Sequence, residues 1–369
     1  MSDTRVIRSI GIEREGSIYF FQYEEGPPPD GHFRVETLYT GLSAGTELTF
    51  YKGTNPYLRS RWDDQLGVFV DGSPSARFPL PFSGYMEVGQ VIESRAKTVK
   101  EGQILGMDYG HKTGHTANAS TDFFYPLPDD IDPILGIYLA RMGPICANGL
   151  LHAAADAVGQ DVRDLGDGVR GRNVLVTGAG VVGLLTALFA LHCGASHVAI
   201  ADVTPRRLEA AQGLGLTALH EAETEVWRYC KERWHHGGSD RGVDVVFQCR
   251  GRTASLQLAL CSLRPQGTVI DMAFYQDGAP DVRLGEEFHH NGLTIRSAQI
   301  NRVPRGLNHA WTRQRLAEET AGLLSTYGKR IRECIITDIL PFDDAPALFD
   351  DLANRRRSVL QAVFRVCGA

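Results

Sequence analysis

Short apolar runs alternate with helical patterns along the chain from about residue 172 onward. The strings NVLVT, HVAIAD, VDVVFQC and TVIDMAF are strand-like, and the stretches VVGLLTALFALHCG, PRRLEAAQGLG and TASLQLALCSLRPQG between them have helical patterns. Such alternation predicts a doubly wound α/β domain, in which helices cover both faces of a parallel sheet. The tail IITDILPFDDAPALFDDLANRRRSVLQAVFRV predicts strand, helix and strand, which need not join that sheet.

The first 150 residues or so predict a β-rich region instead. FRVETLYTGLSAGTE, EVGQVIES and GQILGMDYG carry β-branched and aromatic residues bounded by glycine, as short strands do. YPLPDDIDP is typical of a loop. The chain has 369 residues, which at roughly 100–200 residues per domain predicts two domains.

A glycine-rich turn joins the first strand of the α/β region to its helix. In VLVTGAGVVGLL the glycines 178, 180 and 183 have G-x-G-x-x-G spacing, and Asp202 ends the following strand. The first glycine permits the tight turn, the second lets a diphosphate approach the backbone, and the third lets the helix pack on the strand. A diphosphate would meet the free amides at the helix start. We therefore expect a nicotinamide dinucleotide, held at this turn by Gly178, Gly180, Val181, Val182 and Gly183.

The charges after the second strand favour NAD over NADP. Asp202 would accept hydrogen bonds from the adenosine ribose hydroxyls, and its charge would repel the 2′-phosphate of NADP. Arg206 and Arg207 argue the other way, since arginines just after this strand can hold a 2′-phosphate. NAD is the expected cofactor and NADP the alternative, with Arg207 among the cofactor-binding residues.

Composition narrows the class of protein. The net charge of −6 argues against a nucleic-acid or membrane-surface partner held by bulk charge. No cysteine precedes residue 146 and no two cysteines form a C-x-x-C pair, so we expect no disulfide framework, and a reducing cytoplasm fits. The segment MSDTRVIRSI lacks the apolar stretch of a signal peptide, and no run of about 18 apolar residues predicts a membrane span.

Several further stretches resemble the medium-chain dehydrogenase/reductase superfamily, the fold of zinc alcohol and polyol dehydrogenases. GYMEVGQV matches the family's G-H-E-x-x-G-x-V frame, and VTGAGVVGLL and ADVTPRRLEAAQGLG match its nucleotide-binding half. GLSAGTE and the altered G-H-E frame are similar to a divergent branch that includes the bacteriochlorophyllide hydroxyethyl dehydrogenases. The resemblance covers almost the whole chain and implies a Rossmann domain plus a β-rich GroES-like catalytic domain.

The resemblance also implies domain boundaries, further cofactor contacts and an oligomer. The GroES-like domain would comprise residues 1–153 and 304–369, around an NAD-binding Rossmann domain of residues 154–303. GLTIRSAQI is similar to the edge strand that the family pairs across a two-fold axis, which predicts a homodimer or a homotetramer. The strands around the nicotinamide imply cofactor contacts at Gly251, Met272, Ala273 and Phe274.

The family's catalytic zinc ligands are replaced in this sequence. The G-x-C position is Ser43, the histidine of G-H-E is Tyr85, and the adjacent acid is Met86. A catalytic zinc needs three Cys, His or carboxylate ligands, and the family's structural zinc needs four clustered cysteines. We therefore expect no metal. The alternative is a rearranged zinc site built from other acids and imidazoles, namely Glu47, Glu87, His111 or His115.

Without zinc, another group must polarise the substrate oxygen or move its proton. Tyr85 is the leading candidate because it replaces a ligand that points at this oxygen, and its pKa of about 10 is expected to fall beside a positive nicotinamide. The alternative is that Tyr85 fills the void left by zinc. Thr46 aligns with the family's proton-relay hydroxyl or, alternatively, bonds its own backbone. The expected catalytic residues are Tyr85, Thr46, Ser43 and His115, with His111 as a further loop histidine.

Other polar segments have structural explanations. Glu47 aligns with a structural acid that we expect to pair with an arginine, and we expect His152 to be satisfied by packing on a helix. Residues 57–82 are either a solvated flap or a cover over the substrate mouth.

The sequence thus predicts a zinc-independent, NAD-dependent dehydrogenase that interconverts a secondary alcohol and its ketone. A polyol, a sugar derivative or a related metabolite is the expected small-molecule substrate. An NADPH-dependent enone or quinone reductase is one alternative, and a non-catalytic NAD-binding protein is another.

Overall fold

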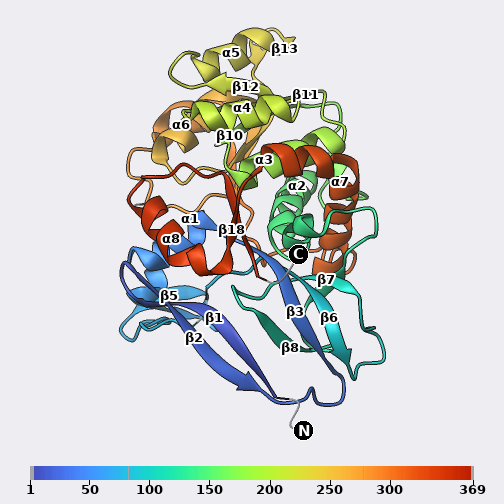
Figure 1. The fold of residues 1–369 in the computed structure, drawn as a ribbon. Coiled ribbons are helices and arrows are strands. Elements are labelled where there is room, and N and C mark those ends of the chain that lie inside the picture. Colours follow the sequence, from blue (N-terminus) through green and yellow to red (C-terminus); the bar gives the residue numbers. More distant parts are fainter. Residues whose placement is uncertain (1–3, 82, 277, 367–369) are drawn as a thin grey trace. The chain divides into compact units, whose positions relative to one another are not determined.

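The computed structural model describes residues 4–81, 83–276 and 278–366, and the chain divides into two compact units (Figure 1). One unit comprises Met1–Arg141 and Ile336–Ala369, and the other comprises Met142–Ile335. The boundaries therefore fall after residues 141 and 335, whereas the sequence predicts them after residues 153 and 303.

Two helices account for this difference. α2 (Met142–Val158) and α7 (Arg313–Cys334) pack against each other, and both contact α3 (Val181–His192). A Cβ on Gly143 would lie 2.1 Å from Cγ2 of Thr320, so α2 and α7 approach closely at this glycine. Both helices therefore belong to the same unit as the nucleotide-type turn.

The unit Met142–Ile335 is built on a parallel sheet. Among the described residues the sheet has six strands in the order β12-β11-β10-β15-β16-β17, with β17 at the edge as predicted. This order is the doubly wound one that reverses direction between β10 and β15. The strands are β10 (Asn173–Thr177), β11 (His197–Asp202), β12 (Thr217–His220), β15 (Val243–Gln248), β16 (Leu263–Asp271) and β17 (Thr294–Ser297).

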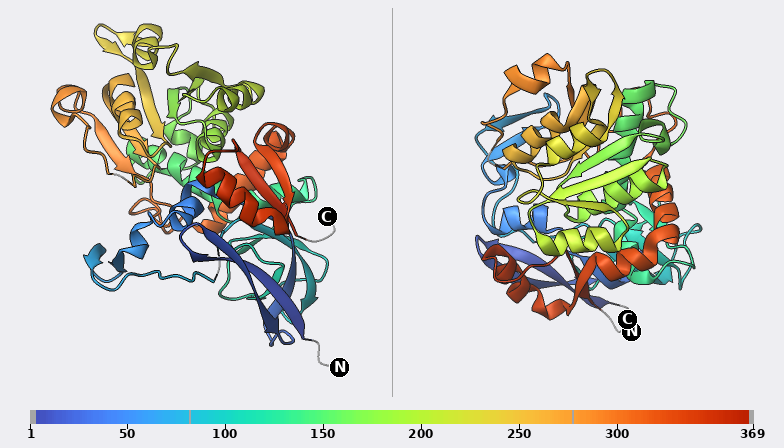
Figure 2. Two further views of the ribbon diagram at one scale, coloured as in Figure 1. Left: turned by 60° about the vertical axis from the view of Figure 1, so that its left-hand side comes forward. Right: turned by 90° about the horizontal axis from the view of Figure 1, so that it is seen from above.

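Helices cover both faces of this sheet (Figure 2). α3 and α4 (Pro205–Gly213) pack on one face, where α7 contacts both. α5 (Val226–Arg233) and α6 (Thr253–Ser262) cover the other face, and Cys230 and Leu256 pack there with Leu175 of the sheet. A short hairpin, β13 (His235–Gly237) and β14 (Asp240–Arg241), follows α5.

The other unit is β-rich. Its described residues include a seven-stranded sheet of order β18-β19-β3-β6-β7-β9, with β8 paired to β3, and a core around Phe33, Val35 and Leu105. The C-terminal strands pair in this sheet and not in the parallel one. The strands are β1 (Arg5–Arg14), β2 (Ser17–Glu25), β3 (His32–Gly41), β4 (Ser60–Asp63), β5 (Val68–Asp71), β6 (Glu87–Ser94), β7 (Ile104–Met107), β8 (Gly114–Asn118), β9 (Phe124–Pro126), β18 (Ile336–Pro341) and β19 (Gln361–Arg365), and the helices are α1 (Ala44–Tyr51) and α8 (Ala345–Ala353).

Most predicted elements of the α/β region are confirmed, but α6 ends earlier than predicted. The chain leaves the helix after Ser262 and enters β16 at Leu263. Pro265 explains the early end, because a proline disfavours helical geometry at the preceding residue and cannot continue the hydrogen-bond ladder.

The segment of residues 57–82 contains a hairpin. β4 and β5 pair antiparallel, and Leu66 and Phe69 on this hairpin are exposed. No helix in the described part of the chain is long and apolar enough to cross a membrane.

Candidate active site

The carboxyl ends of β10 and β15 lie side by side at the point where the strand order reverses. In open α/β sheets, ligands bind in the crevice outside this point. The predicted glycine turn follows β10, and residues 249–251 follow β15. The structure therefore brings these two predicted cofactor segments to one edge of the sheet.

A different steric feature accounts for the glycine at each of these three positions of the turn. Gly178 has a φ of +98°, in the left-handed region that favours glycine. A Cβ on Gly183 would lie 1.8 Å from the carbonyl oxygen of Gly178, so only glycine lets α3 pack on the turn. A Cβ on Gly180 would meet open space, which leaves this residue's surface accessible to a ligand.

The first turn of α3 offers backbone amides. Gly180 is the N-cap and forms no side-chain cap hydrogen bond, and the first intrahelical bond is donated by Leu184 to the Gly180 oxygen at 2.9 Å. The amides of Val181, Val182 and Gly183 precede that bond, and they lie at the positive end of a twelve-residue helix. This end of α3 fits a diphosphate.

Asp202 is buried, with 1% of its surface exposed, and it ties the glycine turn to β11. Its carboxylate accepts from the amide of Ala179 at 2.9 Å and from the amide of Thr204 at 2.8 Å, and it lies 3.6 Å from Arg207. Burial alone would raise the pKa of Asp202, but these hydrogen bonds and the charge of Arg207 lower it. The carboxylate is therefore charged at neutral pH.

A second ion pair between an arginine and an acid lies beside the glycine turn, and it was not predicted from the sequence. Arg250 follows β15, and its Cβ lies 2.7 Å from where a Cβ on Gly178 would be. Its guanidinium lies 3.3 Å from Glu221, the residue after β12. Burial and the charge of Asp202 raise the pKa of Glu221, against the charge of Arg250. The only sequence signal is that an arginine and an acid directly follow strands.

The segment after β16 lies beside the segment after β15. A Cβ on Gly251 would lie 2.2 Å from the oxygen of Phe274, so this glycine permits the close approach. Met272 points inward, with its sulfur near Gly149 and 3.8 Å from the hydroxyl of Thr186. Phe274 is 53% exposed, and the amide of Ala273 donates to Asp271.

In the β-rich unit the structure brings three predicted catalytic residues together. The hydroxyls of Ser43 and Tyr85 share a hydrogen bond, and Thr46, exposed on α1, hydrogen-bonds to the same tyrosine. The guanidinium of Arg141 lies 5.7 Å from the centre of the Tyr85 ring. The site is thus a cluster of hydroxyl groups with a cation over the phenol.

The protein environment raises the pKa of Tyr85. Burial is the largest cause and the charge of Glu47 adds to it, while the hydrogen bonds of Ser43 and Thr46 and the charge of Arg141 oppose it. The sequence predicts that the pKa of Tyr85 falls beside a positive nicotinamide, and burial and the charge of Glu47 act in the opposite direction. Tyr85 is therefore a neutral phenol at physiological pH, able to donate a hydrogen bond.

Glu47 pairs with a histidine, and the predicted arginine partner is wrong. Its carboxylate accepts from the Ser43 amide at 2.7 Å and from the Ser83 hydroxyl at 2.6 Å, and lies 2.8 Å from Nε2 of His111. Burial raises the pKa of Glu47, but His111 and these hydrogen bonds lower it overall. Nδ1 of His111 lies 2.8 Å from the Thr40 hydroxyl. This buried network fixes the backbone of Ser43.

His115 belongs to a separate buried cluster. Its ring stacks on Tyr109 with centroids 3.6 Å apart, and its Nδ1 lies 3.4 Å from Glu87. Burial raises the pKa of Glu87 to about 8, and burial with the charges of Lys112 and Arg5 lowers the pKa of His115. Both groups are therefore neutral near pH 7, and His115 does not join the hydroxyl cluster of the described residues.

His152 is satisfied by packing, as expected. Its Nε2 donates to the oxygen of Arg302 at 2.9 Å, and its Nδ1 accepts from Arg296 at 3.3 Å.

The residues at the family's zinc position do not fit zinc. The hydroxyls of Ser43 and Tyr85 are neutral and bonded to each other, and Met86 is buried with its terminal methyl against Gly41. The described residues hold no group of three or more His, Cys, Asp or Glu side chains arranged to bind a metal. The acids and imidazoles of the alternative site form two separate pairs, Glu47 with His111 and Glu87 with His115.

Comparisons with known proteins point to dehydrogenases. Residues 181–317 match the family described as zinc-binding dehydrogenase. A zinc-type alcohol dehydrogenase-like protein of Escherichia coli (strain K12), itself uncharacterised, is 24% identical over 66% of this chain and 61% of its own length. An L-threonine 3-dehydrogenase of Vibrio parahaemolyticus is 36% identical over 34% of this chain and 35% of its own length. Both matches span less than two thirds of the relative.

Solved structures match over nearly the whole chain. An alcohol dehydrogenase of Thermotoga maritima has a TM-score of 0.74 and 17% identity, and the match covers 98% of this chain and 99% of that one. The 2R,3R-butanediol dehydrogenase of Bacillus subtilis has a TM-score of 0.71 and 17% identity over 97% and 99%. At these identities the likeness is one of fold, and it confirms the predicted Rossmann and GroES-like fold class.

Proposed function

Because this chain belongs to the medium-chain dehydrogenase/reductase superfamily, we propose that it is an NAD-dependent dehydrogenase that interconverts a secondary alcohol and its ketone without zinc. The substrate is a small hydroxylated molecule such as a polyol or a sugar derivative. The observation that carries the proposal is the hydrogen-bonded pair of Ser43 and Tyr85, which stands where the family's resemblance places metal ligands.

The nicotinamide dinucleotide, when bound, accepts or supplies the hydride. The amides of Val181, Val182 and Gly183 bind its diphosphate, and the open surface at Gly180 allows the close approach. Gly251 and the exposed Phe274 lie at the same edge of the sheet, where they contact the rest of the cofactor. These residues hold and orient the cofactor.

Tyr85 donates a hydrogen bond to the substrate oxygen. A neutral phenol is a donor, and its hydrogen bond strengthens as negative charge develops on that oxygen. Ser43 shares a hydrogen bond with the phenol and holds it in place. In oxidation the alcohol proton passes to the Tyr85 oxygen as the phenol proton passes to Thr46, whose exposed hydroxyl releases a proton to solvent, and reduction reverses this order. Arg141, over the phenol ring, favours any negative charge that reaches Tyr85.

The charges around the adenosine end support NAD. Asp202 is ionised, and Glu221 adds a second carboxyl group near it, so a 2′-phosphate would meet acidic groups. Arg207 and Arg250 are each paired with one of these acids, which reduces their attraction for a 2′-phosphate.

We further propose a homodimer or a tetramer of dimers that pairs through β17. This strand is the edge of the parallel sheet, and an unpaired edge presents free amides and carbonyls to another chain.

One experiment tests the proposal directly. Protein purified without added metal is subjected to elemental analysis and is then incubated with NAD and a panel of secondary alcohols, while NADH absorbance is followed. We expect less than one tenth of a zinc per chain and turnover that a chelator leaves unchanged. Stoichiometric zinc, with activity lost to chelator and restored by zinc, would refute the zinc-free part of the proposal, and the absence of turnover on every substrate would leave a non-catalytic protein as the better explanation.

A further inference from the structure

Two charged groups of opposite sign act on the phenol of Tyr85. Arg141 is the last residue of the β-rich unit, and its guanidinium lies 5.7 Å from the centre of the Tyr85 ring. Glu47 supplies the negative charge. These two groups differ in how far the protein itself satisfies them.

Glu47 is fully engaged by the protein. Its side chain is 3% exposed, and one carboxylate oxygen accepts from the Ser43 amide. The other oxygen contacts the Ser83 hydroxyl and His111. Because both oxygens already have partners in the interior, Glu47 has no role in binding a substrate.

Arg141 is held more loosely. Its ion-pair partner is Asp108, whose Oδ2 lies 3.6 Å from Nη1, beyond the length of about 2.7–3.2 Å that an N–H···O bond normally has. The arginine side chain is 27% exposed. A guanidinium carries several N–H donors in a planar fork, more than one carboxylate at this distance can use. Arg141 can therefore donate to an acceptor that arrives from solvent.

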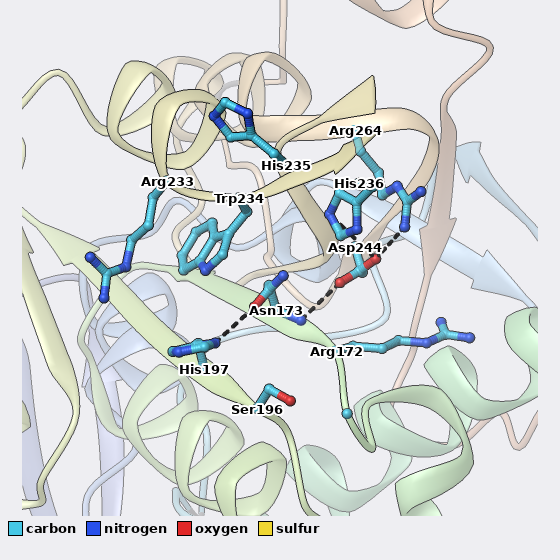
Figure 3. Close-up of a pocket in the computed structure, with 11 residues that line it drawn as sticks. Arg172, Asn173, Ser196, His197, Arg233, Trp234, His235, His236, Asp244 and Arg264 are labelled. Carbon is cyan, nitrogen blue, oxygen red and sulfur yellow. Dashed lines mark hydrogen bonds and ion pairs between the residues drawn. The ribbon is translucent and has the colours of Figure 1, made fainter. Parts of the chain in front are cut away.

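An arginine of the other unit shows the contrast. Arg264 lines a pocket at the amino ends of β10, β11 and β15, and Figure 3 shows it joined to Asp244. Its nitrogens lie 2.7 Å from Asp244 and 2.9 Å from Asp240, both at hydrogen-bond distance. Two acids this close satisfy Arg264, whereas the single, more distant acid leaves Arg141 able to bind one more anion.

We propose that the substrate is itself an anion, either a hydroxy acid or the phosphate ester of a hydroxylated molecule, and that Arg141 binds its acidic group. The reacting hydroxyl meets the phenol of Tyr85, and the carboxylate or phosphate lies beside the guanidinium. The forked donors of arginine match the oxygens of both acidic groups. Because the guanidinium is 5.7 Å from the ring centre, the acidic group stands only a few bonds from the reacting carbon. This inference rests on the proposed function, since it names the substrate class of the same site.

Asp108 competes with the substrate for Arg141. Its carboxylate partly neutralises the guanidinium, so an incoming anion must displace it or share the arginine with it. Removing this competitor should strengthen binding of the anion. Asp108→Asn therefore tests the proposal by a gain, without the loss of Arg141.

Matched pairs of compounds provide the experiment. 3-Hydroxybutyrate is compared with its neutral isostere 3-hydroxybutyramide, and glycerol 3-phosphate is compared with glycerol. Turnover with NAD gives kcat/KM for each compound. Calorimetry of the same compounds with the NADH-loaded protein measures binding alone, because NADH cannot accept a hydride from an alcohol.

We expect the anionic member of a pair to exceed its neutral match by roughly tenfold or more, the range of a hydrogen bond to a charged group. A preference in the first pair identifies a hydroxy acid, and a preference in the second identifies a phosphate ester. Arg141→Met should abolish the preference, and Arg141→Lys should keep part of it, because a point charge remains without the fork. Asp108→Asn should increase it. The ratio within a pair cancels any effect of Arg141 on the phenol, since both members react at Tyr85.

Arg95→Met is the matched control. Arg95 also has an acid at a loose distance, with Glu93 3.8 Å away, and its side chain is 48% exposed. It follows the end of β6, however, whereas Tyr85 precedes the start of that strand. Arg95→Met should therefore keep the full preference for the anion.

Equal values for the two members of both pairs overturn the proposal, and so does binding of none of the four compounds. A preference that persists in Arg141→Met overturns it as well, because another group would then bind the anion. Binding that prefers the anion and depends on Arg141, without turnover of any compound, would support the anion site and refute the dehydrogenase activity. The two failures are thus distinguishable.

Discussion

The hydroxyl groups of Ser43 and Tyr85 share a hydrogen bond, and the backbone of the serine is itself held by a buried carboxylate. The Ser43 amide donates to Glu47 at 2.7 Å, and Glu47 lies 2.8 Å from His111. A phenol positioned by groups that are themselves fixed loses little freedom when it meets a substrate. The network therefore favours Tyr85 as a hydrogen-bond donor, and not only as a filler of the space that a metal would take.

Replacing Tyr85 by Phe should lower turnover by roughly 10²–10³-fold, because one transition-state hydrogen bond is lost while the ring remains. The dissociation constant of NADH, measured by calorimetry, should stay within about twofold, since the cofactor residues are untouched. Tyr327→Phe, which removes a phenol hydroxyl from α7, serves as the matched control and should retain full turnover. Undiminished turnover in Tyr85→Phe would reduce this residue to packing and move attention to Thr46.

Cofactor choice should respond to Glu221. In Glu221→Gln a negative group near the adenosine end disappears, and Arg250, at 3.3 Å from Glu221, loses its ionic partner. The ratio of NADPH to NADH affinity should therefore rise by roughly three- to tenfold, the range of a modest ion-pair contribution. This variant leaves the bonds of Asp202 to Ala179 and Thr204 intact, so the glycine turn keeps its support.

Calorimetric titration of both cofactors measures this ratio. Glu223→Gln is the control, since this acid is two residues away and largely exposed. Tighter binding of NADPH than of NADH by the unmodified protein would contradict the NAD assignment itself. An unchanged ratio in Glu221→Gln would mean that the pair with Arg250 is structural only.

The buried pair of Glu87 and His115 predicts a pH dependence of stability. Burial raises the pKa of Glu87 from 4.5 to about 8, so between these values the folded state holds a proton that the unfolded state has lost. Stability therefore falls as pH rises through this window. The lowered pKa of His115 acts in the opposite direction, because below its ordinary value of 6.5 the unfolded state binds the extra proton. The two effects oppose each other below pH 6.5, and Glu87 acts alone from 6.5 to about 8.

Urea unfolding at pH 6.5 and pH 8 compares the protein with Glu87→Gln, which is neutral at both values. The unmodified protein should lose about 1–2 kcal/mol more than the variant over this interval, from about 1.4 kcal/mol per unit of pKa difference. Equal losses in the two proteins would place the pKa of Glu87 in its ordinary range.

Much of the nucleotide-binding unit could be predicted from the sequence because the features that define it lie within short stretches of the chain. The strands are short apolar runs, and the steric demands on Gly178 and Gly183 arise within a few residues. The pairs that define the candidate sites are long-range: Glu47 meets His111 across 64 positions of the sequence, and Arg250 meets Glu221 across 29. No pattern along a single strand encodes such contacts, since they depend on sheet order and register.

The helix α7 shows a second reason why part of the fold could not be predicted from the sequence. Its buried residues Leu316, Thr320, Leu323 and Leu324 follow helical spacing, so the helix itself could have been found in the sequence. Its packing on α2 and α3 could not, because the tail that follows it belongs to the other unit.

The edge strand β17 predicts how the chain associates. The amide of Ala298 donates inward to Asp271 at 2.9 Å, so by alternation the amide of Ser297 points away from β16. Ser297→Pro should therefore remove an outward donor and weaken a dimer formed through this edge, while the inward ladder to β16 survives. Ala298→Pro is the matched comparison, because it breaks an inward bond and should lower stability. Light scattering at micromolar concentration should give a dimer or tetramer for the unmodified protein and a shift toward monomer for Ser297→Pro. A monomeric parent protein, or an oligomer that Ser297→Pro leaves intact, would exclude pairing through β17.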